Sequence, residues 1–244
     1  MQNMKLSIII PTLEEEKILE KMLISLKELN KIDYEVIVSD GHSKDKTVEI
    51  AKKYANKVIE HDGLTRQTIA AGRNAGANIA QGDFLVFLDA DVFIPEINTF
   101  FTKAISKFEK EKRLVALVPY LKTLPEYEKW SDYISLIILN SIYYFMNNIL
   151  QKGSAGGEFQ MFRRETFEKI GGYNKNMVVC EDIEMLMRMS KIGKTRLDTS
   201  LIVMHTSRRA HNEGWISLWR KWIFNAISNI IFKKPAVGEW NVSR

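Results

Sequence analysis

Two carboxylates at the end of an apolar run are the first sign of chemistry in this sequence. Phe84 to Leu88 is typical of a buried strand, and Asp89 and Asp91 follow it one residue apart. Carboxylates in such a position are costly to desolvate unless water or a cation meets them. Mg²⁺ and Mn²⁺ take oxygen ligands from one or two carboxylates and complete their shell with substrate phosphates. The pattern therefore favours a divalent metal beside a phosphate-bearing ligand.

Strand-like and helix-like segments alternate in the chain around these acids. The expected strands are residues 5–10, 34–39, 56–60 and 84–89, and the expected helices are residues 14–29, 44–55 and 65–80. This alternation predicts βαβ units and a mostly parallel sheet with helices on both faces. Because ligands in such sheets bind beyond the carboxyl ends of the strands, the polar runs PTLEEE, SDGHSKD and DAD are expected to converge on one crevice.

The usual phosphate-binding loops are missing from the expected positions. The turn after the first strand is PTLEEE, without the glycines of a dinucleotide-binding fingerprint, and the sequence has no Walker motif. A phosphate at this turn would meet three glutamates. The sequence therefore favours a nucleotide held through a metal ion between the acids and the phosphates.

Composition places the chain among globular proteins. Its 244 residues are 45% hydrophobic and 27% charged, with a net charge of +5. The single cysteine, Cys180, excludes an internal disulfide and a thiolate metal cluster. The basic balance suits an anionic partner, although we expect no nucleic acid. Residues 1–5 lead directly into a strand-like run rather than a signal peptide, so we expect a cytosolic chain.

Five motifs in order resemble those of the family 2 glycosyltransferases with the GT-A fold. They are LSIIIPTLEEEKILEKMLISL, VIVSDGHSKDKT, GRNAGANIAQGDFLVFLDADV, GGEFQMFRRETFEKIGGYN and CEDIEMLMRMSKIGK. The resemblance runs from about Leu6 to Lys194. It implies an α/β GT-A fold, a nucleotide-diphosphate sugar donor such as a UDP- or GDP-sugar, Mn²⁺ or Mg²⁺, and inversion at the anomeric carbon. We expect one domain over residues 1–244, with a nucleotide-sugar lobe (1–95) and an acceptor lobe (96–244) that carries additional helices.

The resemblance assigns nucleotide contacts to the ends of the first two strands. Asp40 resembles the acid that accepts a hydrogen bond from the imide N–H of uracil, although an Asp before Gly41 is also typical of a turn. Pro11, Thr12 and Glu14 lie where the family holds the base and ribose. Glu14 could equally be an acid favoured by the dipole at a helix N-terminus.

Three arginines are expected near the phosphates. Arg73 resembles the arginine that reaches the nucleotide, and the small residues around it would let its helix lie close to the sheet. Arg208 and Arg209 could bind phosphate of the donor or of a lipid-linked acceptor. For all three residues, a solvated charge is the alternative.

The resemblance also divides the acids at the metal. Asp91 would coordinate the ion, while Asp89 would face the ribose or a metal-bound water. His205 follows an apolar run that could return it to the metal, and a structural histidine is the alternative. The ion would offset charge on the leaving nucleotide.

A later acidic pair matches the E-D motif of the family. Inverting transfer needs a base that takes the proton of the attacking acceptor hydroxyl. We assign Asp182 as this base and Glu181 as a residue that positions the acceptor, although either could cap a helix. Gly156 and Gly157 would give the backbone room beside the donor sugar, or form an ordinary turn.

Two apolar segments have no role in soluble sugar chemistry. Residues 133–151 carry no charge, and residues 215–232 combine aromatic residues with Arg220 and Lys221. A membrane span at residue 140 would separate Asp91 from Asp182, so we expect interfacial helices at the membrane surface. Core helices and an oligomer interface are the alternatives.

The combined hypothesis is an inverting, metal-dependent glycosyltransferase at the cytoplasmic face of the cell membrane. The acceptor would be a sugar, a lipid-linked group or a polyprenyl phosphate. Processive relatives carry Q-x-x-R-W where this chain has SLWRKW, which favours single transfers. The alternatives are a nucleotidyltransferase of related architecture and a catalytically silent membrane-surface or scaffold protein, and a homo-oligomer remains open.

Overall fold

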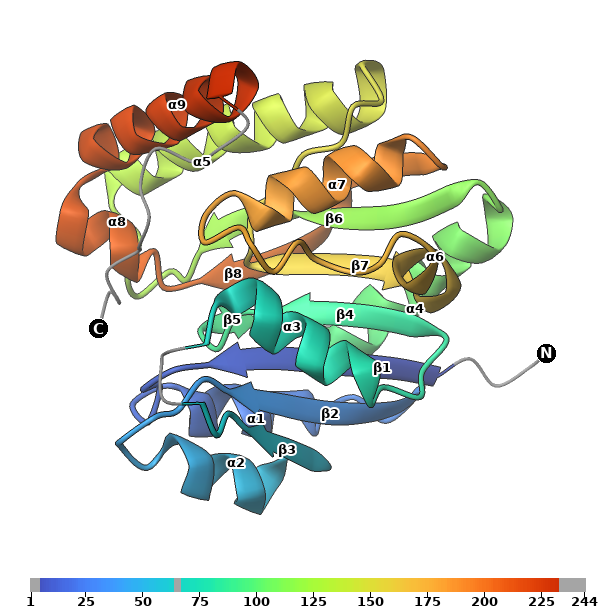
Figure 1. The fold of residues 1–244 in the computed structure, drawn as a ribbon, viewed down its shortest axis with the longest axis vertical. Helices are drawn as coiled ribbons and strands as arrows, with labels where there is room; N and C mark the ends of the chain where they lie inside the picture. Colours follow the sequence, from blue (N-terminus) through green and yellow to red (C-terminus); the bar gives the residue numbers. More distant parts are fainter. Residues whose placement is uncertain (1–4, 64–66, 233–244) are drawn as a thin grey trace.

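The computed structural model describes residues 5–63 and 67–232. Over these residues one eight-stranded mixed sheet runs through the molecule, in the order β3-β2-β1-β4-β7-β6-β8-β5 (Figure 1). The strands are β1 (Lys5–Thr12), β2 (Asp33–Asp40), β3 (Lys57–Glu60), β4 (Phe84–Leu88), β5 (Val92–Phe93), β6 (Leu114–Thr123), β7 (Phe159–Arg163) and β8 (Lys194–His205).

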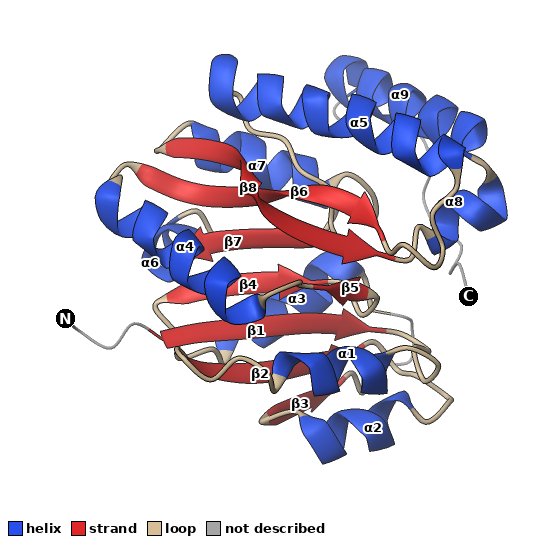
Figure 2. Ribbon diagram, turned by 180° about the vertical axis from the view of Figure 1, so that it is seen from behind, coloured by secondary structure: helices blue, strands red, loops and turns tan. Residues whose placement is uncertain are grey.

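Helices cover both faces of this sheet. They are α1 (Leu19–Leu26), α2 (Thr47–Tyr54), α3 (Ile69–Asn78), α4 (Ile97–Lys110), α5 (Trp130–Tyr144), the π-helical turn η1 (Phe145–Ile149), α6 (Arg164–Lys169), α7 (Glu181–Ser190), α8 (Arg208–Glu213) and α9 (Trp215–Phe232). Helices α3 and α7 lie in front of the sheet in Figure 1, whereas α1 and α4 lie in front of it when it is seen from behind in Figure 2.

The parallel part of the sheet confirms the expected strands. β1 pairs with β2 and β4, and β2 pairs with β3, all in parallel. Every residue of β4 is buried, as expected for an apolar run inside a sheet covered on both faces. Thr12 lies opposite Asp40 in the register, so the polar runs after β1 and β2 lie at the same edge. The carboxyl end of β4 lies at this edge too.

The first helix begins later than the pattern predicts. We expected a helix over residues 14–29, but Glu14 adopts a left-handed backbone with φ of 58°, and α1 begins at Leu19. The backbone N–H of Glu14 donates to Ser43 Oγ at 2.8 Å, and that of Glu15 donates to Thr47 Oγ1 at 2.8 Å. The turn after β1 is therefore held by side chains that follow β2.

Antiparallel strands join the two predicted lobes. β7 pairs with β4 in antiparallel fashion, with Phe159 opposite Leu88. β5 pairs with β8 in the same sense, with His205 opposite Val92. These pairings place residues near 158 and 205 beside the acids that follow β4. Because the sheet is continuous through both lobes, the boundary at residue 95 stays a prediction.

The expected helices over residues 133–151 and 215–232 correspond to α5 with η1 and to α9. α5 packs against β6 and β8, and Asn140 of α5 exchanges hydrogen bonds with the backbone N–H and C=O of Leu121, both at 2.9 Å. α9 lies beside α5 at the outer edge of the molecule (Figures 1 and 2). In the part of the chain that the structure describes, no helix has both the length and the apolar character needed to cross a membrane.

Helix α3 lies close to the sheet because of its small residues, as the sequence predicted. A Cβ added to Gly76 would lie 2.4 Å from Cγ2 of Ile9 in β1. We therefore expect Gly76→Val to lower the free energy of unfolding by about 1 to 3 kcal/mol, since extra methyl groups overpack this contact. Urea unfolding followed by circular dichroism measures the change.

The matched control is Ala75→Val, at a partly exposed position of the same helix. It introduces the same β-branched side chain into the helix, at a propensity cost below about 1 kcal/mol relative to Ala, without the overpacking. Equal destabilisation by the two variants would show that the close approach of α3 to β1 is unimportant.

Candidate active site

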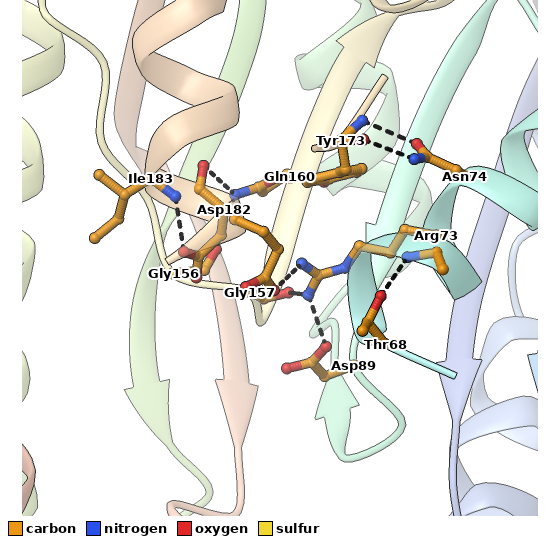
Figure 3. A network of polar contacts seen from close by, with 12 residues as sticks. Thr68, Arg73, Asn74, Asp89, Gly156, Gly157, Gln160, Tyr173, Asp182 and Ile183 are labelled. Atoms are coloured by element: carbon orange, nitrogen blue, oxygen red, sulfur yellow. Dashed lines mark hydrogen bonds and ion pairs between the residues drawn. The ribbon is translucent and has the colours of Figure 1, made fainter. Parts of the chain in front are cut away.

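The side chain of Arg73 connects the two acidic motifs of the chain. Its Nη1 donates to Glu181 at 3.0 Å. Its Nη2 donates to Asp89 at 3.2 Å and to the carbonyl oxygen of Gly157 at 3.0 Å (Figure 3). The guanidinium lies over the ring of Tyr173, 5.2 Å from its centroid, and the side chain is 2% exposed. We expected Arg73 to reach the nucleotide. The structure buries it between β4 and α7, where protein acceptors occupy both terminal nitrogens, and its contact with a nucleotide stays a prediction.

The glycine at residue 157 marks the point where the acids meet. A Cβ added there would lie 2.7 Å from Nη2 of Arg73 and 3.6 Å from a carboxylate oxygen of both Asp89 and Asp182. A side chain would therefore displace the guanidinium and fill the space between the two acids. The structure thus brings together Asp89 after β4, Asp182 at the start of α7 and the glycines before β7.

Carboxylates outnumber cationic side chains around Gly157. Burial and the nearby carboxylates of Glu158 and Asp91 raise the pKa of Asp89 to about 7, against the opposing effect of Arg73. Burial also raises the pKa of Asp182 well above its ordinary value, and Glu181 adds to the increase while Arg73 opposes it. The Asp89 side chain remains 38% exposed, so a solvent-borne cation can approach it. A cation there would stabilise the ionised form of these groups.

Asp91 and His205 are neighbours through the pairing of β5 with β8. The hydroxyl of Thr206 donates to the Asp91 carboxylate. His205 is 8% exposed, and its Nε2 is buried without a hydrogen-bond partner. The backbone N–H of Ser207 approaches Nδ1 of His205 at 3.3 Å, so ligation through Nε2 requires the opposite tautomer.

This donor set fits a metal ion that is shared with a ligand. Among the described residues, no group of three or more His, Cys, Asp and Glu side chains gathers to hold an ion. One carboxylate, completed by diphosphate oxygens and water, matches the way Mg²⁺ and Mn²⁺ bind at phosphate-transfer sites, and the imidazole of His205 would add a nitrogen ligand. Asp91 and His205 are therefore the residues that would hold the ion.

Hydrogen bonds from neighbouring residues occupy the carboxylate of Asp40. One of its carboxylate oxygens accepts from Thr12 Oγ1 at 3.1 Å and Ser43 Oγ at 2.5 Å, and the other accepts from the backbone N–H of His42 at 3.0 Å and of Ser43 at 2.8 Å. These four bonds use the acceptor capacity of a carboxylate. Direct contact of Asp40 with a uracil N–H stays a prediction, and the side chain clearly orders the loop after β2.

The turn after β1 holds the remaining residues that are predicted to contact the nucleotide. Pro11 and Thr12 end β1, and Glu14 follows in the left-handed region. Glu14 lies outside α1, so it is not an acid of that helix's first turn. The structure places these three residues at the same edge as Asp40, and their contact with a base or ribose stays a prediction.

Arg208 and Arg209, the two arginines at the start of α8, are both paired with carboxylates. Arg208 donates from both terminal nitrogens to Glu15, at 2.9 and 2.8 Å, which joins α8 to the turn after β1. The hydrogen bond to Glu15 raises the pKa of Arg208, and the charges of Asp91 and Asp89 also contribute. Arg208 thus lies near the acids while it is paired. Arg209 pairs with Glu213 within α8 at 3.1 Å, and phosphate binding by either arginine stays a prediction.

A second network, absent from our sequence predictions, supports Asp182. The Tyr173 hydroxyl donates to Gln160 Oε1 at 2.5 Å, and Gln160 Nε2 donates to the carbonyl oxygens of Gly156 at 3.2 Å and Asp182 at 3.4 Å. Asn74 of α3 fixes Tyr173 through both its backbone N–H and C=O, at 2.9 and 2.8 Å (Figure 3). Gln160 is fully buried inside β7, and a polar residue within an apolar strand was the available signal.

Strained backbone occurs in the loops that border these residues. Glu14, itself a predicted site residue, has positive φ. So do His42, two residues after Asp40, Cys180, directly before Glu181, and Ser207, directly before Arg208. Residues held in this region cost about 1 to 3 kcal/mol each and often cluster at functional sites. Cys180 precedes Glu181, and burial together with the neighbouring acids raises the pKa of its thiol to about 12, so it stays a neutral thiol.

Comparison with known proteins found a family model that matches more than half of the chain. A family model described as glycosyl transferase family 2 matches residues 7–171. Over 96 residues, 37% of this chain, the sequence is 36% identical to the poly(ribitol-phosphate) beta-N-acetylglucosaminyltransferase TarS of Staphylococcus aureus (strain Mu50 / ATCC 700699). The chain spans 17% of the length of that relative.

Two solved structures share the fold. The mannosyltransferase PcManGT from Pyrobaculum calidifontis, in complex with GDP-Man and Mn²⁺, superposes with a TM-score of 0.66 at 17% identity, over 89% of this chain and 64% of that chain. S. aureus TarS 1–349 in complex with UDP-GlcNAc superposes with a TM-score of 0.65 at 19% identity, over 82% and 57%. The fold is the GT-A fold that the motifs predicted.

The support of Asp182 by Gln160 can be tested by removing one hydroxyl. Tyr173→Phe leaves Gln160 Oε1 buried without its donor, which costs about 1 to 3 kcal/mol, and lets the Gln160 amide move. We expect turnover to fall about tenfold, because Asp182 and the loop that holds Gly156 would be misplaced. Nucleotide affinity should stay unchanged, as measured by calorimetry beside steady-state kinetics.

Tyr144→Phe, at a side chain 44% exposed on α5, is the matched control. If Tyr173→Phe matches this control in turnover, the hydroxyl of Tyr173 has no positioning role.

Proposed function

Because the chain belongs to glycosyl transferase family 2, we propose that it transfers a sugar from a nucleotide-diphosphate donor to an acceptor with inversion at the anomeric carbon. The observation that carries this proposal is the convergence of Asp89 and Asp182 beside Gly157, with Arg73 between their motifs. One acid follows the strand expected to face the donor, and the other begins the helix expected to face the acceptor. The two acids thus have different environments within one site.

The donor side of the proposed site consists of Asp89, Asp91 and His205. Asp91 and His205 would hold Mn²⁺ or Mg²⁺ together with the diphosphate. When bound, the ion supplies Lewis-acid stabilisation of charge on the leaving nucleotide. Solved neighbours contain GDP-Man with Mn²⁺ and UDP-GlcNAc, which supports a GDP- or UDP-sugar as the donor class.

The acceptor side consists of Asp182 and its supports. In its ionised form the Asp182 carboxylate takes the proton of an acceptor hydroxyl while the hydroxyl oxygen bonds to the anomeric carbon. The bond from that carbon to the diphosphate breaks, and the nucleoside diphosphate leaves with the electron pair. Glu181 is occupied by Arg73, so its role in this step is to fix the start of α7 rather than to bind the acceptor.

Single transfers and a lipid-linked acceptor complete the proposal. The SLWRKW sequence in α9 lacks the glutamine of the processive motif, which supports one transfer per encounter. The acceptor class is supported by the outer layer of α5 and α9, which exposes apolar side chains near Arg220 and Lys221. The nucleotidyltransferase and silent-scaffold alternatives receive no support from the arrangement of Asp89, Asp91 and Asp182.

Two asparagine variants should separate metal binding from base chemistry. We expect Asp91→Asn to lose Mn²⁺-dependent binding of a nucleoside diphosphate, because it removes the charged oxygen ligand. We expect Asp182→Asn to keep that binding and to lose about 10²- to 10⁴-fold in turnover, as removal of a general base typically does. Calorimetry with UDP and GDP, and a screen of nucleotide sugars for hydrolysis with Mn²⁺, measure the two effects.

Asp33→Asn, at the exposed first residue of β2, is the matched control and should change neither quantity. Unchanged Mn²⁺-dependent affinity in Asp91→Asn would remove Asp91 from the metal site. An Asp182→Asn variant within twofold of the parent, with chemistry shown to limit the rate, would remove Asp182 as the base.

The raised pKa of Asp182 predicts a pH dependence. The base acts in its deprotonated form, so kcat/KM rises as the pH passes the pKa of Asp182, above the ordinary aspartate value of about 3.9. Because Glu181 contributes to the increase, Glu181→Gln should move this acid limb to lower pH. A pH profile of kcat/KM for the two proteins measures the shift.

Glu184→Gln, on the same helix but paired with Arg188, provides the control and should leave the limb in place. An identical acid limb in the parent and in Glu181→Gln would show that another group controls the profile.

A further inference from the structure

Helix α5 buries three polar side chains on its inner side and exposes a row of apolar side chains on its outer side. The inner side holds Asp132, Ser135 and Asn140, which are at most 7% exposed. On the outer side a row of apolar residues continues through η1, and each of them is between 39% and 59% exposed: Tyr133, Ile134, Ile137, Ile138, Ile142, Tyr144, Phe145 and Ile149. Exposed apolar surface of this extent on a protein in water marks an interaction site.

The neighbouring helices add cations beside this apolar row. A groove of ≈ 1130 Å³ lies between the start of α5, α8 and α9, and its lining includes Lys129, Arg220 and Lys221. Ile216 and Phe224, also in the lining, are 80% and 62% exposed. Among the described lining residues the one carboxylate is Glu213, which pairs with Lys221 at 2.5 Å. The groove therefore keeps an excess of positive charge.

Buried hydrogen bonds fix these helices to one another. Asp132 of α5 accepts from Trp215 Nε1 at 2.6 Å and pairs with His211 Nε2 at 2.7 Å. Although burial opposes it, these two partners hold the pKa of Asp132 below its usual range. The apolar row of α5 and the cationic groove therefore belong to one rigid face.

We propose that this face binds the surface of a lipid bilayer that contains anionic lipids. The groove cations would meet the headgroup phosphates, and the apolar row of α5 would enter the boundary between headgroups and acyl chains. This pairing of exposed isoleucines with lysine and arginine is typical of interfacial helices. A symmetric pair of protein copies joined through the face would instead bring two cationic grooves together, which like-charge repulsion opposes.

The same helix connects this face to the loop that holds Gly156 and Gly157. Tyr143, on the inner side of α5, is 7% exposed, and its hydroxyl lies 3.3 Å from the position of a Cβ on Gly156. A bilayer on the outer side of α5 would thus lie one helix away from the glycines beside Asp182. An acceptor carried by a membrane lipid could reach the site from this side, and this last step rests on the proposed function.

Sedimentation with vesicles tests the proposal on the full chain. We expect binding to vesicles of phosphatidylglycerol and phosphatidylcholine, weaker binding to phosphatidylcholine alone, and partial release by salt. Arg220→Gln with Lys221→Gln should lower the partition coefficient about tenfold, since each basic residue near an anionic surface contributes to binding. Ile134→Ser with Ile138→Ser should lower it by about tenfold or more, because less apolar surface is buried.

Each double variant has a matched control on another face of the molecule. Lys52→Gln with Lys53→Gln removes two adjacent cations from α2, where Lys52 pairs with Glu60 at 2.6 Å. Ile24→Ser with Ile79→Ser removes two isoleucines that are 47% and 40% exposed. Both controls should bind vesicles like the parent, and melting temperatures exclude unfolding as the cause of any loss.

Several results would overturn the proposal. They are a parent protein that ignores anionic vesicles, and face variants that bind as well as their controls. A dimer in analytical ultracentrifugation that Ile134→Ser with Ile138→Ser dissociates, without vesicle binding, would assign the face to a second copy. If a chain that ends at residue 232 bound vesicles and the full chain did not, the face would be assigned to residues 233–244 as its occupant.

Nucleotide binding, measured in the same samples without vesicles, keeps the two proposals separate. We expect all four double variants to bind UDP or GDP with Mn²⁺ like the parent. Vesicle binding by a protein that binds neither nucleotide would overturn the proposed function and leave the membrane face intact.

Discussion

The buried guanidinium of Arg73 is the interaction on which the site depends. Its ion pairs with Asp89 and Glu181 span 16 and 108 residues of sequence, so they tie the end of β4 to the start of α7. Breaking a buried ion pair by removal of one partner leaves an uncompensated charge and costs several kcal/mol. With the guanidinium in place, Glu181 is partnered while Asp182 points to the space beside Gly157. The positions of the acids therefore follow from one desolvated cation.

The parallel half of the fold could be predicted from the sequence, but the antiparallel half could not. Alternating strand and helix patterns locate β1 to β4 because those patterns are local. The pairing of β4 with β7, about seventy residues away, depends on packing that no local period encodes. The late start of α1 escaped prediction because side chains after β2 hold the backbone of Glu14 and Glu15.

The candidate site could also be predicted only in part. Motif resemblance identified Asp89, Asp91 and Asp182, since each lies at the end of a recognisable element. It did not predict the burial of Arg73, because burial depends on which partners the fold supplies, and contact of Arg73 with a nucleotide stays a prediction. Gln160 and Tyr173 were missed because their value lies in hydrogen bonds to each other, which the sequence does not display. The bidentate pair of Glu15 with Arg208 was missed for the same reason, because its two residues are 193 positions apart in the sequence.

The continuous sheet also determines what kind of motion can admit substrate. β4 of the first lobe is hydrogen-bonded to β7 of the second, and β5 to β8, so the halves cannot rotate apart without breaking ladder bonds. Enzymes with separate domains open and close around a linker, whereas this frame leaves only the loops free to rearrange. Glu14, His42 and Ser207 lie in such loops, in backbone conformations above their minimum energy. Local changes of backbone torsion in these loops are therefore the rearrangements that leave the pairing of the sheet intact.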